Sequence, residues 1–265
     1  MPTEADDYSH VRKNVKSICA NLRFDESLIP PARNEYVAWI DLMGAGRVMR
    51  VSPPKTANFL ARLHMAVAIA MTNANAEVKA VPINDGVFVI TPCKTTVMKM
   101  VRHALSLLGG YFISQHRPHD RFMVRSSLAY GPVYHGDTLT KGISKRKQGH
   151  YAKAFNNIAF GAPVVQAYTE ERRAPPFGCV IHESATTFAP EGVRPFREEF
   201  WIWWKSHNEL GRVDGMVDLP DLAKCLASDL SAHFDWMVEH RLRNGVSKEQ
   251  VIGWRETTSQ YFSVG

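Results

Sequence analysis

Apolar positions recur along this chain with two different spacings, and each spacing predicts a different kind of element. Residues 36–41 read Tyr-Val-Ala-Trp-Ile-Asp, a short run that is apolar on both faces and typical of a buried central strand. Asn84-Asp85-Gly86 separates two β-rich runs and favours a tight hairpin, because these residues tolerate positive φ. Strands are predicted at residues 36–41, 77–81, 86–91, 122–130, 179–182 and 200–205, with a break at Gly131-Pro132 before a short strand into His135.

Apolar residues three and four positions apart predict amphipathic helices. This spacing covers residues 55–73 and 94–113. Residues 157–171 read as the end of a strand that turns into a helix at Gly161-Ala162-Pro163, since proline suits the first helical turn. With two further helices at 220–243 and 247–261, the order is βα, ββ, α, ββ, α, β and then helices, which is an α+β fold with hairpins.

The same pattern divides the chain into three predicted segments. Residues 1–34 are polar, end in Pro30-Pro31 and read as a mobile or lightly docked N-terminal leader. Residues 35–215 contain the strands and form the main domain, and residues 216–265 form a C-terminal helical extension.

Composition restricts the class of protein without identifying a function. The 265 residues are 45% hydrophobic and 22% charged, which excludes a disordered chain or a coiled coil. Four scattered cysteines, no signal peptide and no apolar stretch of membrane-spanning length predict a soluble cytoplasmic protein. The formal net charge of +6 is compatible with a polyanionic substrate, and it leaves nucleic-acid binding as a weaker interpretation.

Two carboxylates are the strongest candidates for chemistry. Asp41 ends the predicted central strand and Asp85 lies in the hairpin turn, so the two converge if strand and hairpin are neighbours. Paired carboxylates repel each other unless a cation lies between them, and oxygen ligands suit Mg²⁺ or Mn²⁺. The alternatives are a turn-forming role for Asp85 and a strand-end or helix N-cap role for Asp41.

Several cations and backbone groups are candidates for binding phosphate. The loop Met43-Gly44-Ala45-Gly46 can present N–H groups to triphosphate oxygens, or it is simply a tight turn. Arg47 and Arg50 follow it and reach either phosphate or solvent. The basic run from Lys141 to Lys147 either closes over a triphosphate or is solvated.

Arg125 and a group of tryptophans each allow two interpretations. Arg125 begins a strand and either stabilises a transition state or crosses a dimer interface, the alternative being an edge-strand arginine in a surface ion pair. Trp201, Trp203 and Trp204 either stack on bases or pack in the core.

Four segments taken together resemble a known family. YVAWIDLMGAG, VKAVPINDGVFVI, RFMVRSSLAYGPVYHG and NIAFGAPVVQAYTEE occur in the order found in class III nucleotide cyclases, and they look still more like the pyrimidine cyclases of bacterial Pycsar anti-phage defence. The resemblance covers residues 36–171, about half the chain. It implies a βαββαβ core with a mainly antiparallel sheet, and a head-to-tail homodimer with active sites at the interface. It also implies that two Mn²⁺ or Mg²⁺ ions bind Asp41, Asp85 and the backbone carbonyl of Leu42.

The departures from purine cyclases indicate the base. The family's helix asparagine and arginine are replaced by Val165 and Thr169, and its purine-selecting lysine and aspartate by Val81 and Ile158. An apolar residue facing a base edge leaves a hydrogen-bonding group unpaired, at a cost of ~1–3 kcal/mol. The resemblance with these departures implies cyclisation of a pyrimidine triphosphate, UTP rather than CTP, to a messenger such as cUMP that acts on a separate effector. Alternatives are CTP or a purine triphosphate, or a catalytically degenerate cyclase-like domain that binds a nucleotide or a partner.

Overall fold

The computed structural model of the protein describes residues 8–19, 24–74, 77–143, 149, 152–187, 196, 198–206, 210, 218–240 and 246–263. Their contacts form two compact units. The larger comprises residues 33–133 and 160–265, and the smaller comprises residues 1–32 and 134–159. Three predictions fall partly outside the described residues: residues 1–7 and 20–23 of the leader, Lys145, Arg146 and Lys147 of the basic loop, and residues 241–243 of the first terminal helix.

A mostly antiparallel sheet with helices on its faces confirms the predicted α+β class. In the described residues the strand order is β2-β3-β1-β4-β5, and β6 pairs with β4 in parallel. The pairs β1–β3, β1–β4 and β2–β3 are antiparallel. The strands are β1 Arg33–Leu42, β2 Lys79–Ile83, β3 Gly86–Thr91, β4 Val124–His135, β5 Ala159–Phe160 and β6 Cys179–Ile181.

The predicted central strand is confirmed and is longer at both ends. Residues 36–40 of β1 are buried, because β3 and β4 flank the strand and helices cover both faces. Side chains alternate between the faces, so Ile40 and Leu42 join the main hydrophobic core while Trp39 and Asp41 lie on the opposite face. The register of the two strand pairs places Asp41 directly between Gly86 of β3 and Arg125 of β4.

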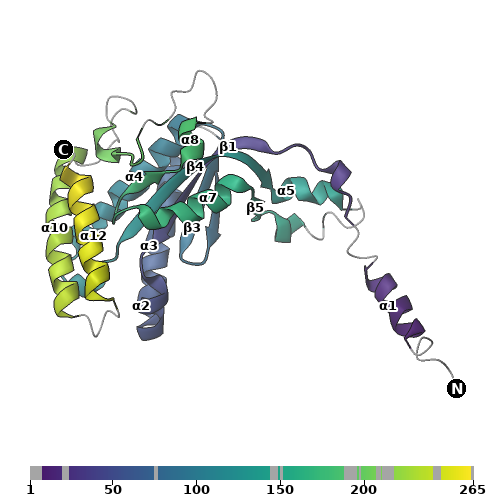
Figure 1. The fold of residues 1–265 in the computed structure, drawn as a ribbon, viewed down its shortest axis with the longest axis horizontal. Coiled ribbons are helices and arrows are strands. Elements are labelled where there is room, and N and C mark those ends of the chain that lie inside the picture. The colour runs from purple at the N-terminus through teal and green to yellow at the C-terminus, as the bar shows by residue number, and fades with distance from the viewer. Residues whose placement is uncertain are drawn as a thin grey trace. The chain divides into compact units, whose positions relative to one another are not determined.

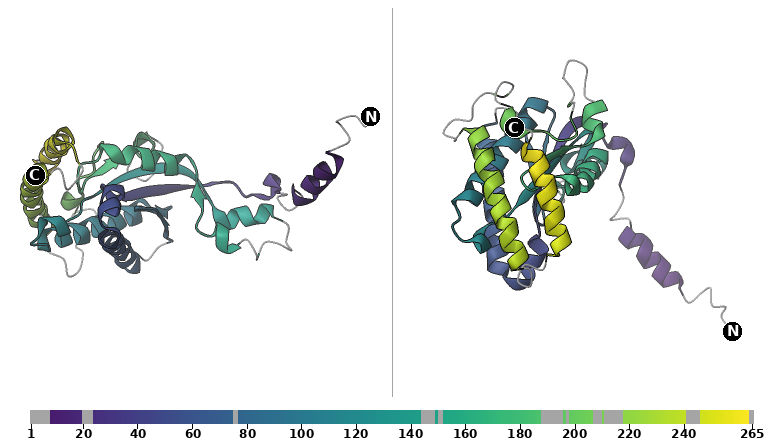
Figure 2. Two further views of the ribbon diagram at one scale, coloured as in Figure 1. Left: turned by 90° about the horizontal axis from the view of Figure 1, so that it is seen from below. Right: turned by 60° about the vertical axis from the view of Figure 1, so that its left-hand side comes forward.

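Helices form a layer on each side of the sheet, as Figures 1 and 2 show. The helices α3 and α4 lie against the face that carries Ile40, and α7 lies against the face that carries Asp41. The helices α10 and α12 lie side by side, and α10 packs on α4. The bounds of the helices in the larger unit are α2 Ala45–Val51, α3 Pro53–Thr72, α4 Lys94–Ser114, α7 Ala162–Glu170, α8 Glu183–Thr187, α10 Leu219–Glu239 and α12 Lys248–Ser263, with 3-10 turns η3 Pro118–Asp120, η5 Glu171–Arg173 and η6 Trp203–Lys205.

The prediction of a strand at residues 200–205 is wrong. Phe200 makes a single bridge to Val180, and the chain then turns into η6. Trp201, Trp203 and Trp204 are buried in the core, which confirms their packing role. The indole N–H of Trp203 donates to the Phe177 carbonyl at 2.8 Å, so the aromatic residues are fixed from inside the fold rather than by strand pairing.

The predicted break at Gly131-Pro132 is also wrong. Strand β4 runs through both residues, and Pro132 lies opposite Asn34 of β1. A Cβ at Gly161 would lie 2.2 Å from the Pro132 carbonyl oxygen, so the start of α7 passes directly over this part of β4. The close approach explains the glycine, which the sequence pattern had marked only as a turn.

The smaller unit contains short helices. Its elements are α1 Ser9–Cys19, η2 Glu26–Leu28, α5 Gly136–Leu139 and η4 Thr140–Gly142. The Asp25 N–H donates to the Gly142 carbonyl at 2.8 Å, and a Cβ at Gly142 would lie 2.6 Å from the Phe24 ring. Two parts of the predicted leader thus have defined structure. Residues 9–19 form the helix α1, and residues 24–28 pack on η4.

Candidate active site

Asp41 is the next-to-last residue of the buried central strand β1. Its side chain is 14% exposed and points to the face that α7 covers. Trp39, two residues earlier on the same face, contacts Tyr168 of α7 with ring centroids 5.6 Å apart. The alternation of the strand therefore places an ionisable side chain in a mostly buried position. Burying a charge there costs free energy unless a partner compensates it.

The hairpin between β2 and β3 brings Asp85 to the same end of the sheet. Asn84 adopts φ +51°, and Ile83 pairs with Gly86, so the predicted hairpin forms with a turn of two residues, shorter than the predicted connection of residues 82–85. The backbone carbonyl of Asp85 accepts a hydrogen bond from the Leu42 N–H at 3.1 Å. Among the described residues the Asp85 carboxylate accepts no hydrogen bond from the neighbouring backbone, which leaves its oxygens available for another ligand.

Arg125 and Glu171 complete the group of charges. The Arg125 Nη2 donates to Glu171 Oε1 at 3.1 Å, its Nε contacts Glu171 Oε2, and its Nε lies 3.8 Å from Asp41 Oδ2. Glu171 is 5% exposed and lies in η5, directly after α7. Because β4 has neighbours on both sides, the edge-strand interpretation of Arg125 is wrong.

The surroundings raise the pKa of Asp41 to about 7. Burial is the largest cause, and the negative charges of Glu171 and Asp85 add to it, whereas Arg125 and Arg172 lower the pKa. Burial and the charge of Asp85 also raise the pKa of Glu171, whereas Arg125 and Arg172 lower it. Asp41, Asp85 and Glu171 thus share the guanidinium groups of Arg125 and Arg172. When all three carboxylates are ionised, the group carries one negative charge in excess.

This arrangement fits a divalent cation held by two carboxylates. Among the described residues no three His, Cys, Asp or Glu side chains are grouped to hold a metal by themselves. An ion between Asp41 and Asp85 would therefore need further oxygens, for which the Leu42 carbonyl and substrate phosphates are candidates. A bound cation would offset the excess charge and keep Asp41 ionised at neutral pH.

The loop after β1 agrees only in part with its predicted phosphate-binding role. The Met43 N–H is already bonded to the Met123 carbonyl at 2.9 Å. Gly44 adopts φ +75° and precedes α2, so Ala45 and Gly46 lie in the first turn of a helix that the sequence did not predict. The N–H groups of such a turn have no intrahelical partner. Arg50 is exposed at the far end of α2.

Glu171 escaped prediction because nothing in its local sequence separates it from a surface charge. It lies within the charged run Glu170-Glu171-Arg172-Arg173, which reads as a solvated helix end. Its contact with Arg125 joins residues 46 positions apart and exists only because α7 packs on β1.

Replacing Glu171 by glutamine should lower the pKa of Asp41. The change removes a negative charge that raises this pKa and releases Arg125 to approach Asp41. The measurement is an NMR titration of the Asp41 carboxyl carbon, assigned by its loss in Asp41→Asn. The control is Glu170→Gln. Glu170 is the neighbouring residue and pairs with Arg173, so its replacement should leave the titration of Asp41 unchanged. An unchanged midpoint in Glu171→Gln would remove Glu171 from the site.

Comparison with known proteins gives structural similarity only. The sequence matches no protein-family model and no curated protein. A guanylyl cyclase domain of the RhoGC fusion protein from the aquatic fungus Blastocladiella emersonii is 16% identical over 59% of this chain and 84% of its own, with a TM-score of 0.43. An adenylate cyclase from Trypanosoma brucei is 9% identical over 62% and 79%, with a TM-score of 0.42. The guanylate cyclase domain of RhGC from Catenaria anguillulae, solved with GTP, is 16% identical over 58% and 81%, with a TM-score of 0.42.

Proposed function

We propose that the chain is a metal-dependent nucleotidyl cyclase that converts a pyrimidine nucleoside triphosphate, with UTP as the preferred substrate, into its 3′,5′-cyclic monophosphate and pyrophosphate. One observation carries the proposal. Asp41 of β1 lies opposite Gly86, next to Asp85 in the hairpin turn, at a site where burial and mutual repulsion raise the pKa of Asp41 to about 7, and Arg125 lies 3.8 Å from Asp41. A cation and a phosphate chain are the ligands that such a site accommodates.

The reaction would be intramolecular. The substrate's 3′-hydroxyl oxygen attacks the α-phosphorus, its proton leaves to solvent, and the bond to the pyrophosphate oxygen breaks. Divalent ions at such a site lower the pKa of the hydroxyl and neutralise the phosphates. Asp41 and Asp85 would hold those ions through their carboxylates, and Leu42 through its carbonyl. The guanidinium of Arg125 is the nearest protein cation to Asp41 and would stabilise the charge that develops on the phosphate.

Both positions that select a purine in the resembled family carry apolar side chains here. Val81 is 1% exposed in β2 and offers no polar atom from its side chain. Ile158 is 38% exposed, and its side chain offers no polar atom either. These side chains supply no hydrogen bond that a purine edge would require, which supports a pyrimidine substrate.

The quaternary and cellular parts of the proposal follow from the same resemblance. Val165 is 63% exposed and Tyr168 is 49% exposed on α7, an apolar surface suited to the partner subunit of a homodimer with shared active sites. No described helix combines the length and apolar character that a membrane crossing needs. We place the enzyme in the cytoplasm, where its cyclic product would act on a separate effector during anti-phage defence.

The proposal is tested by incubating the chain with UTP, CTP, ATP and GTP separately, each with Mn²⁺, and resolving the products by chromatography and mass spectrometry. The expected result is 3′,5′-cUMP as the main product, with release of pyrophosphate. Dominant cCMP would correct the base, and dominant cAMP or cGMP would overturn the pyrimidine assignment. Nucleotide binding without any cyclic product would favour the catalytically degenerate alternative.

A further inference from the structure

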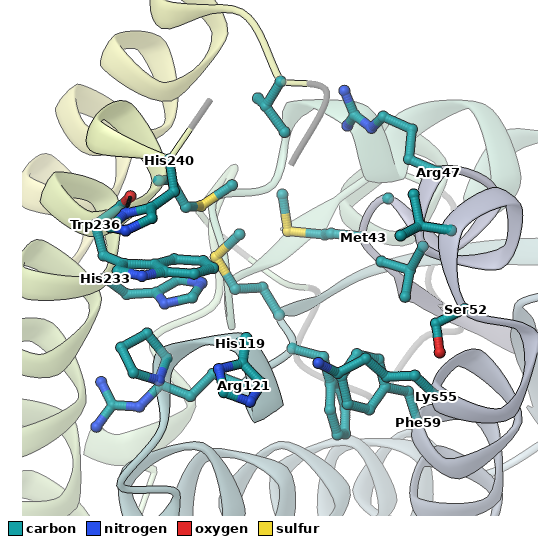
Figure 3. Close-up of a pocket in the computed structure, with 18 of the residues that line it drawn as sticks. Met43, Arg47, Ser52, Lys55, Phe59, His119, Arg121, His233, Trp236 and His240 are labelled. Atoms are coloured by element: carbon teal, nitrogen blue, oxygen red, sulfur yellow. Dashed lines mark hydrogen bonds between the residues drawn. The ribbon is translucent and has the colours of Figure 1, made fainter. Parts of the chain in front are cut away.

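A hollow is lined in part by the loop that follows Asp41. It has a volume of about 640 Å³ and is enclosed by the start of α2 and α3, by η3 and by the helices α10 and α12. Figure 3 shows Lys55 and Phe59 on one side, His233 and Trp236 on the other, and Met43 between them. Cavities of roughly 300–1,000 Å³ accommodate small organic ligands.

The cavity is lined by apolar side chains with cationic groups among them. Arg47, Lys55 and Arg121 contribute to its wall, and none of the described lining residues carries a carboxylate. Two of the cations have acidic neighbours outside the wall: Asp120 lies 3.5 Å from Lys55, and Asp229 lies 3.3 Å from Arg121. The Arg47 guanidinium donates to the Gln250 side-chain oxygen at 3.2 Å. The interior thus favours negative charge over positive charge.

Stacked aromatic rings form one side of this wall. The ring of His233, which is 5% exposed, stacks on Trp236, and Trp236 stacks in turn on His240, with centroids 5.4 Å and 5.1 Å apart. Such a stack offers flat apolar surface to the body of an organic ligand.

We propose that this cavity binds an amphipathic organic anion, with an aromatic or aliphatic body against Trp236 and Phe59 and one anionic group toward Lys55 and Arg47. None of the lining residues is Asp41, Leu42 or Asp85, although Met43, Gly44 and Arg47 belong to the segment considered above for phosphate binding. Met43 and Gly44 line the cavity only two and three residues after Asp41. A bound ligand would therefore brace the loop into which the catalytic strand runs, and the cavity is suited to an effector.

The test uses a matched pair of fluorescent probes on the full chain, without nucleotide or metal. 8-Anilinonaphthalene-1-sulfonate carries an anionic group, and N-phenyl-1-naphthylamine has the same rings without it. We expect saturable binding of the sulfonate at one site per chain, about fivefold or more tighter than the neutral probe. The absence of saturable sulfonate binding, or equal affinity for both probes, would overturn the proposal.

Variants locate the binding. Lys55→Met and Arg47→Met should each weaken sulfonate binding about fivefold and leave the neutral probe unaffected, because each removes a charge and keeps an apolar stem. Lys224→Met is the control, since Lys224 is an exposed lysine of α10 outside the cavity. If the three substitutions weakened sulfonate binding equally, or if Lys55→Met and Arg47→Met had no effect on it, the probe would bind outside this cavity. Since the assay includes no triphosphate, its outcome is independent of whether the chain cyclises nucleotides.

Discussion

Replacing Asp41 by asparagine is expected to abolish turnover and to make the metal-free protein harder to unfold at pH 8. The pKa of Asp41 is about 7 in the folded protein against 3.8 in the unfolded chain, with burial as the largest cause. Between these values the unfolded chain loses its proton first. The free energy of unfolding therefore falls as pH rises from about 4 to about 7, and the full penalty remains above that range.

Asparagine keeps the shape of the side chain and cannot ionise, so the variant escapes this penalty. Its gain over the natural protein should be near zero at pH 4 and on the order of 4 kcal/mol at pH 8. Urea unfolding followed by circular dichroism in EDTA at pH 4, 6 and 8 measures it. Asp221→Asn, at an exposed ion pair on α10, should change the free energy of unfolding by less than about 0.5 kcal/mol.

Metal should reverse the order of stability. With Mn²⁺ at pH 8 the natural protein should gain in melting temperature, because the ion binds only the folded site, whereas Asp41→Asn should gain little. Turnover retained in Asp41→Asn would remove Asp41 from the metal site. The difference in free energy of unfolding between Asp41→Asn and the natural protein should be larger at pH 8 than at pH 4. An equal difference at both pH values would contradict the conclusion that the Asp41 carboxylate carries a penalty for being buried and charged.

Replacing Gly86 by alanine is expected to lower the free energy of unfolding by about 3 kcal/mol and to displace Asp85. A Cβ at residue 86 would lie 2.3 Å from the Trp39 ring and 2.8 Å from the Ile40 carbonyl oxygen. Trp39 is packed against Phe88 and Tyr168, so neither the ring nor the strand backbone can yield without moving β1. The hairpin tip must then move away from the end of β1, and activity should fall with it.

Gly46→Ala is the matched control for this change. No atom lies within 4 Å of a Cβ placed there, and the residue is exposed in α2. Alanine should stabilise that helix by roughly 0.5–1 kcal/mol. Chemical denaturation of both variants measures the difference. A Gly86→Ala protein within 0.5 kcal/mol of the natural one would show that the contact of Gly86 with Trp39 does not hold the hairpin.

Much of the fold and three of the four charged residues of the candidate site were predictable from the sequence. The central strand, the hairpin at Asn84-Asp85 and the two long helices between strands all depend on short-range patterns, namely apolar spacing and turn-forming residues. The convergence of Asp41 and Asp85 needed one further condition, that β1 lies beside β3, and the register confirms it. The roles of these residues as metal ligands remain predictions.

The errors have a common physical origin. Residues 200–205 have the composition of a strand, but Trp203 and Trp204 are held by core packing and a hydrogen bond to Phe177. Composition shows that such side chains avoid water without specifying which backbone conformation achieves it. The short helix α2 was missed because Gly44 and Gly46 suggested a loop, whereas Gly44 serves only to lead into the helix.

The sequence by itself indicated most of the strands, the hairpin and the long helices, and it placed Asp41 near the end of one strand and Asp85 in the hairpin turn, because these properties depend on residues close together along the chain. The tertiary structure decided which charges face one another. Pairing of β4 with β1 sets Arg125 opposite Asp41, and packing of α7 on β1 brings Glu171 to them. Packing of α10 on α4 places His233 in the wall of the cavity. Both depend on contacts between distant segments, whose geometry is settled only when the helices are docked on the sheet.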